Sequence, residues 1–170
     1  MVALGAIAVV AAGCGNQAPP TASTSTSGAP PPPPPSLNGS TVSLSASYPT
    51  VDQVYTNTVT GTVPVSWPKG TLYSTRHRLV QVNASFDITG SQVTETFLIG
   101  TRLGTGTFNG PVYKFTGAPA ITKVSVDPQS DPTVAPAGIA FTADSISVND
   151  AGLTVTDGAK QTLDVTFATP

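Results

Sequence analysis

The densest group of chemically capable side chains in the sequence is the segment "TRHRL" at residues 75–79. In an extended strand, Arg76 and Arg78 point to one face and His77 points to the other. The two arginines share the parity of the apolar residues in the strand that follows. Two guanidinium groups at the open rim of a sheet could bind a carboxylate, a phosphate or a sugar. The alternative is that both arginines are solvated and protect a sheet edge.

Trp67, the only tryptophan, lies directly before the turn signal "PKG" at residues 68–70. An indole ring at that position could stack on a sugar or on a partner protein. The alternative is that the ring belongs to the core or to its edge. Arg76, Arg78 and Trp67 are the ligand-binding residues that the sequence predicts.

The sequence contains no recognisable catalytic constellation. His77 is the only histidine, and no G-x-S-x-G motif offers it an activated serine. Glu95 is the only glutamate, and the sequence assigns it no second acid, so paired-carboxylate chemistry is not predicted. We therefore expect no catalytic residues, and an envelope hydrolase is the least favoured of three functions considered.

Several aspartates coincide with turn signals, namely Asp127, Asp131, Asp150 and Asp157. Aspartate starts turns by accepting hydrogen bonds from nearby backbone N–H groups. Two such loops could hold calcium if they met at one end of a sandwich, but no Asp-x-Asp-x-Asp-Gly loop is present. With one cysteine and one histidine, a thiolate or multi-histidine metal site within the chain is excluded. We expect no metal and no cofactor.

Cys14 is the only cysteine, and it follows the apolar run "MVALGAIAVVAAG" at residues 1–13. That run is too short to span a bilayer, which needs about 20 helical residues. It matches the apolar region of a secretory signal peptide, which ends in small residues. The sequence Ala11-Ala12-Gly13-Cys14 resembles the lipobox of bacterial lipoproteins. The resemblance implies that residues 1–13 are removed and that Cys14 carries a diacylglycerol and acyl chains such as palmitate.

The lipobox resemblance predicts an extracytoplasmic protein anchored to the outer face of the cell membrane. Two or more acyl chains anchor a protein stably, whereas one chain does not. The chain departs from the lipoprotein pattern because no Lys or Arg precedes the apolar run, so we expect the start codon to lie further upstream. The composition resembles that of proteins from GC-rich actinobacterial genomes.

Residues 14–37 form a proline-, serine- and threonine-rich segment that includes six consecutive prolines, Pro30 to Pro35. Such a composition cannot bury enough apolar surface to offset the entropy of ordering. The proline run favours polyproline II, which extends about 3.1 Å per residue. We expect a flexible stalk that holds the following domain away from the membrane.

Residues 38–170 predict strand after strand, separated by turn signals. In "VQVNASFDI", residues 80–88, apolar and polar residues alternate, and residues 92–99 return in phase as a β-hairpin. Further strands are expected at residues 42–48, 59–67, 112–115, 121–126, 139–148, 153–156 and 163–167. Pro64 places its strand at an edge or at a bulge.

The predicted fold is an all-β antiparallel sandwich of the immunoglobulin-like kind, with a small β-barrel as the alternative. Charged residues make up 9% of the chain and the net charge is −2, which argues against a nucleic-acid partner. The favoured function is a non-catalytic binding or interaction domain displayed on the cell envelope, with an envelope protein, glycan or lipid as partner. The alternative is a carrier of a lipid or another apolar small molecule, which requires a cavity of about 300 Å³ or more.

Overall fold

The computed structural model describes residues 32–76 and 80–169, and all the strands belong to one compact unit that begins at Pro33. Threonine, valine and serine alternate through much of this region, which favours extended backbone. The strands are β1 (Thr41–Ser47), β2 (Val59–Thr62), β3 (Val65–Trp67), β4 (Ala84–Thr89), β5 (Gln92–Phe97), β6 (Thr101–Arg102), β7 (Gly110–Thr116), β8 (Ile121–Val126), β9 (Gly138–Phe141), β10 (Ser145–Asn149), β11 (Thr154–Val155) and β12 (Lys160–Phe167). A single 3-10 turn, η1 (Pro132–Val134), precedes β9.

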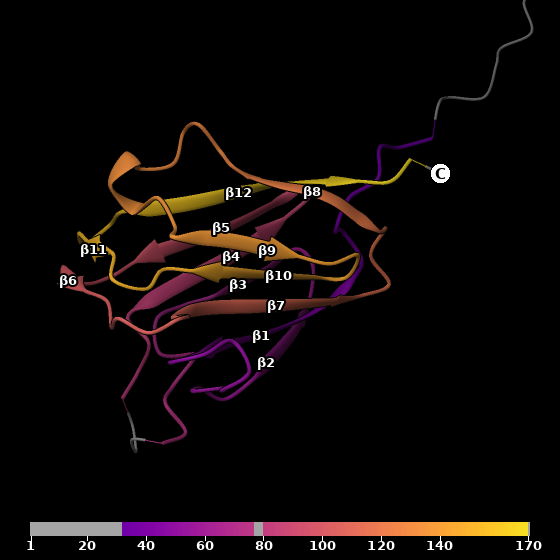
Figure 1. Ribbon diagram of the computed structural model, residues 1–170. Coiled ribbons are helices and arrows are strands. Elements are labelled where there is room, and N and C mark those ends of the chain that lie inside the picture. The colour runs from indigo at the N-terminus through magenta and orange to yellow at the C-terminus, as the bar shows by residue number, and fades with distance from the viewer. Residues whose placement is uncertain (1–31, 77–79, 170) are drawn as a thin grey trace, which may run out of the picture. The chain divides into compact units, whose positions relative to one another are not determined.

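The strands form two five-stranded antiparallel sheets that pack face to face (Figure 1). One sheet has the order β2-β1-β7-β10-β9 and the other β3-β4-β5-β12-β8, while β6 and β11 pair as a short ribbon at one end. The predicted all-β sandwich is therefore confirmed, and the barrel alternative is not adopted. Over residues 32–76 and 80–169, the structure has no helix that is long and apolar enough to cross a bilayer.

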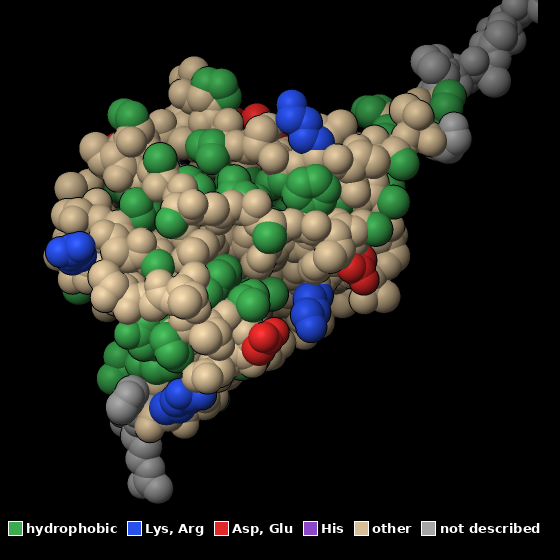
Figure 2. All heavy atoms as spheres, viewed as in Figure 1, with side chains coloured by type: hydrophobic (Ala, Val, Ile, Leu, Met, Phe, Trp, Pro, Cys, Tyr) green, Lys and Arg blue, Asp and Glu red, His purple; other side chains and the backbone are tan. Residues whose placement is uncertain are grey.

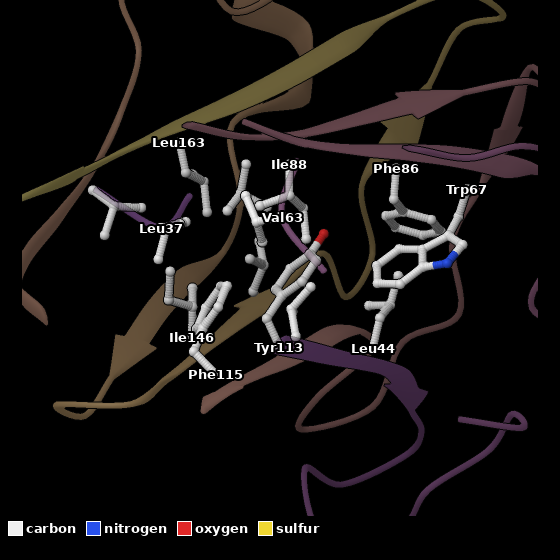
Figure 3. Packing of buried hydrophobic residues seen from close by; sticks show 14 of the residues in the cluster. Leu37, Leu44, Val63, Trp67, Phe86, Ile88, Tyr113, Phe115, Ile146 and Leu163 are labelled. Carbon is white, nitrogen blue, oxygen red and sulfur yellow. The ribbon is translucent and has the colours of Figure 1, made fainter. Parts of the chain in front are cut away.

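The core lies between the sheets and is built from alternate residues of each strand. Phe86 and Ile88 of β4 point toward Tyr113 of β7 and Leu44 of β1 (Figure 3). The rings of Phe86 and Tyr113 meet edge to face with centroids 6.4 Å apart, a geometry that aromatic pairs prefer. The hairpin predicted around residues 89–91 is confirmed, because β4 and β5 pair from Ala84↔Phe97 to Thr89↔Gln92.

The chain changes sheets at Pro64. The sequence predicts one strand over residues 59–67, whereas the structure has β2 at the edge of one sheet and β3 at the edge of the other. Proline has no N–H to donate to a ladder, so the strand is interrupted there. The predicted edge position is confirmed, and the predicted continuity is wrong.

Two further boundaries differ from the sequence prediction. Residues 139–148 form the β9–β10 hairpin rather than one strand, because Thr142 bonds back to Ser145 and closes a turn. Leu37, which the sequence places in the stalk, is fully buried, and its N–H bonds to the carbonyl of Gly90. The packed domain therefore begins before residue 38.

Candidate functional site

The structure describes two of the three ligand-binding residues that the sequence predicts, Trp67 and Arg76. Trp67 lies in the core with 7% of its surface exposed and faces Leu44 (Figure 3). Arg76 is exposed in a bend rather than a strand, and its Nη2 lies 3.5 Å from Oε1 of Gln53. Arg78 and His77 fall outside the described residues, as does Cys14. Trp67 and Arg76 do not share a site.

A cavity of about 350 Å³ lies between the two sheets at the end where β1 finishes and β7 begins. Its walls are mainly aliphatic and aromatic, and its rim includes two exposed residues, Val80 and Ile99. Both sheets and their connecting loops contribute to the lining, which comprises Ala46, Ser47, Tyr55, Val80, Gln81, Val82, Asn83, Ala84, Phe86, Glu95, Phe97, Ile99, Thr101, Leu103, Asn109, Gly110, Pro111 and Asp150. An apolar cavity with a few polar groups is the usual form of a small-molecule site.

Glu95 reaches this cavity from the centre of β5. The inward residues of β5 are Val93, Glu95 and Phe97, so the alternation that buries two apolar side chains also buries the carboxyl between them. Only 6% of Glu95 is exposed. On the neighbouring strand β12, Gln161 is its register partner and is equally buried. The sheet thus places a glutamate and a glutamine side by side on its inner face.

Asp150 reaches the cavity from the opposite sheet, directly after β10. Its backbone N–H bonds to the carbonyl of Asn109 at 2.7 Å, and its Oδ1 accepts a hydrogen bond of 3.0 Å from Nε2 of Gln161. The same Nε2 donates to the carbonyl of Val134 at 2.7 Å. Both amide hydrogens of Gln161 are therefore used, one of them on Asp150, which has 1% of its surface exposed.

Gly110 makes room for this arrangement. A Cβ at residue 110 would collide with the carbonyl oxygen of Val148 and would lie 3.0 Å from Oδ2 of Asp150. A side chain at residue 110 would therefore disturb both the backbone of β10 and the carboxyl group that lines the cavity.

The two carboxyl groups are electrostatically coupled. Burial raises the pKa of Glu95 well above its usual range, and the nearby charge of Asp150 raises it further. Burial raises the pKa of Asp150 to about 6, against the lowering effect of the hydrogen bond from Gln161. The hydrogen bond from Gln161 favours the ionised form of Asp150, whereas Oε2 of Glu95 has no donor among the described residues.

Tyr113 completes the polar environment of the pair. Burial raises the pKa of its phenol well above 10, and the charges of Glu95 and Asp150 raise it further. The phenol therefore stays neutral throughout the physiological pH range. It belongs to the buried cluster but does not line the cavity.

Two buried polar atoms in the cavity wall have no hydrogen-bond partner, Oγ of Ser47 and Oε2 of Glu95. Buried polar atoms in folded proteins nearly always have a partner, and leaving one without costs about 1–3 kcal/mol. Ser47 is 1% exposed at the end of β1. A molecule in the cavity that carried hydrogen-bond donors could satisfy both atoms.

The acids do not form a metal centre in the part of the chain that the structure describes. In residues 32–76 and 80–169, the structure brings no three side chains of the metal-ligating types together. Asp127 and Asp131 act as turn residues, accepting hydrogen bonds from the N–H groups of Gln129 and Thr133. The chemistry available at the cavity is therefore hydrogen bonding, proton exchange and charge pairing.

Sequence reasoning missed the pairing of Glu95 with Asp150. One signal was present, because Glu95 occupies the inward parity of Val93 and Phe97 in the predicted hairpin. Gln161 shows the same signal in phase with Leu163. Asp150 gave no signal of its own, since an aspartate in "NDAG" is typical of a turn.

No protein-family model, curated protein or solved structure significantly matches this chain. Function is accordingly inferred from the chemistry of the cavity and its two carboxyl groups.

Proposed function

We propose that the domain is a non-catalytic binding protein that holds a small, mainly apolar molecule in the cavity between its sheets. The observation that carries this proposal is the cavity itself, about 350 Å³ in volume and lined largely by apolar side chains. Together with the lipobox resemblance at Cys14, the proposal describes a carrier or receptor for small molecules, tethered at the outer face of the cell membrane.

The volume sets the size of the ligand. A 150 Å³ apolar cavity accommodates benzene, so in proportion a cavity of this size accommodates about 14 non-hydrogen atoms. A longer molecule would have to extend through the rim past Val80 and Ile99, whose exposed apolar side chains would contact it. A short amphiphile or an aromatic compound fits, and an entire membrane lipid does not.

The cavity favours small-molecule binding over a purely protein-binding module. Arg76 and Trp67, two of the residues that would have served such a module, do not line the cavity. By contrast, Ser47 and Glu95 line it, and each has a buried side-chain oxygen without a hydrogen-bond partner in the described part of the chain. A site of this kind gains stability when it is occupied.

Binding can be tested on the full chain carrying Cys14→Ser, purified from its own cells without detergent and examined by native mass spectrometry. We expect a co-purifying small molecule. The variant Ala46→Leu, which adds bulk to the cavity wall, should lose that molecule, while Ala120→Leu at an exposed loop should keep it. If 4-phenylbutanol, added at millimolar concentration, fails to bind the unsubstituted cavity in NMR titrations, the proposal is wrong.

The anchor can be tested separately. We expect the mature protein in cells to begin at Cys14, with a mass increment for diacylglycerol and acyl chains, and to fractionate with membranes. The variant Cys14→Ser should lose the increment and the membrane association. An unmodified Cys14 in the cell-derived protein would contradict the lipoprotein assignment without affecting the cavity.

A further inference from the structure

The geometry points to the class of ligand: we propose that the molecule bound in this cavity carries a protonated amine, which pairs with Glu95 and Asp150 at the inner wall. This inference rests on the proposed function, because it assigns a ligand class to the same cavity. The amine would occupy the polar inner wall, and an apolar body would fill the remaining space.

The inner wall holds two acidic side chains and, among the described residues, no basic one. Glu95 and Asp150 come from opposite sheets, and both are buried. No Lys, Arg or His is among the residues that line the cavity in the described part of the chain. A buried charge without a partner is costly in proteins, and an opposite charge brought by a ligand removes that cost.

The hydrogen-bond inventory matches an ammonium group rather than an anion. Oε2 of Glu95 and Oγ of Ser47 lack partners, and a carboxylate oxygen can only accept. An ammonium offers three donors and no acceptor. Both amide hydrogens of Gln161, the neighbour of the two acids, already go to Asp150 and Val134, so this amide has none left for an incoming carboxylate.

The rest of the cavity suits the apolar body of such a molecule. Phe86 and Phe97 line it from β4 and β5, and Leu103 and Ile99 line it from the segment around β6. Figure 2 shows that hydrophobic side chains also gather on the surface at the lower left of the view. The ligand class is therefore an amine attached to an aliphatic or aromatic body of about ten carbons.

The test compares three probes that share one body, 4-phenylbutylamine, 4-phenylbutanol and 4-phenylbutyrate, by calorimetry on the Cys14→Ser chain at pH 7.5. We expect the amine to bind at least tenfold more tightly than the alcohol, and the carboxylate to bind more weakly than both. Equal affinities for amine and alcohol would overturn the inference and leave the proposed function intact. If none of the three binds, the proposed function fails as well.

Two variants separate charge pairing from simple cavity filling. Asp150→Asn keeps the acceptor for Gln161 but removes the charge, and it should bring the amine affinity close to that of the alcohol. Ala46→Leu should weaken amine and alcohol alike. If Asp150→Asn leaves the preference for the amine unchanged, the ammonium does not pair with these carboxyl groups.

The pH dependence gives an independent readout. Among the described residues, the titratable side chains that line the cavity are Glu95, Asp150 and Tyr55, and Tyr113 of β7 is buried next to the two acids. Because the pKa of Asp150 is about 6, amine affinity should rise about tenfold from pH 5 to pH 8 while the amine stays protonated. Alcohol affinity should not rise. An amine affinity that stays flat over this range would contradict the pairing.

Discussion

Asp150→Asn should make the unliganded protein more stable at neutral and alkaline pH. The pKa of Asp150 is raised from 3.8 in an unfolded chain to about 6 in the folded protein, chiefly by burial. Between these values the unfolded chain binds fewer protons than the folded one, so stability falls as pH rises. The loss reaches about 3 kcal/mol once Asp150 is ionised, at 1.36 kcal/mol per pKa unit.

The asparagine variant avoids this loss because it carries no charge at any pH. Its side-chain oxygen can still accept from Nε2 of Gln161, the contact that holds Asp150 at 3.0 Å. We therefore expect the two proteins to be about equally stable near pH 3.5. At pH 8 the variant should be more stable by up to about 3 kcal/mol.

The assay is urea unfolding of both proteins between pH 3.5 and 8, monitored by the fluorescence of Trp67. Trp67 is the only tryptophan in the sequence and is buried in the folded protein. Asp157→Asn, at an exposed residue, controls for the change in net charge and should track the unsubstituted protein. We compare the free energy of unfolding of the two proteins at each pH. The contribution of exposed groups such as Asp131, whose pKa is lowered by hydrogen bonds from Thr133, is the same in both and drops out of the difference. An Asp150→Asn protein less stable than the unsubstituted one at pH 8 would refute the reasoning.

Three further substitutions test neighbouring parts of the structure. Gly110→Ala should destabilise the domain by about 2–4 kcal/mol in urea unfolding, because the added Cβ collides with the carbonyl of Val148. Gln161→Met should lower the free energy of unfolding by about 2–4 kcal/mol, because both hydrogen bonds of the amide are lost. It should also raise the pKa of Asp150 further, which the carboxyl chemical shift would measure. Arg76→Ala should change neither the free energy of unfolding nor the affinity for the probe molecules, because Arg76 is exposed and does not line the cavity. A tenfold loss of affinity would show that Arg76 belongs to the binding site.

The alternation of residue types was enough to predict the layers of this fold. Period-two patterns such as Val42, Leu44 and Ala46 identify strands because one face must be buried. The same patterns misjudged continuity at Pro64, which has no N–H to donate to a sheet, and at Thr142, whose N–H closes a turn onto the carbonyl of Ser145. Strand order was not predictable, because pairing such as β1 with β7 joins residues far apart in sequence.

The candidate site was harder to predict because it depends on that long-range pairing. Glu95 and Asp150 meet only because β5 and β10 lie in facing sheets. The residues that stand out in the sequence, Trp67 and Arg76, do not line the cavity. Trp67 is large enough to be needed in the core, and Arg76 lies in a bend, so neither reaches the cavity. Buried polar groups within an apolar alternation, such as Glu95, are less conspicuous in a sequence than surface arginines.

A role in binding explains why a small domain would retain two buried acids that weaken it. If Asp150 only held the fold together, replacing it would be harmful with or without ligand. If it pairs with an amine, the stability advantage of the variant should shrink on binding, because a ligand at 100 times its Kd stabilises the unsubstituted protein by about 2.7 kcal/mol and a variant that binds tenfold more weakly by about 1.4 kcal/mol. With 4-phenylbutylamine at that excess and pH 8, the stability advantage of Asp150→Asn in urea unfolding should shrink by about 1.3 kcal/mol. If Asp150→Asn keeps its whole stability advantage in the presence of the amine, the acid pair has no part in binding cations.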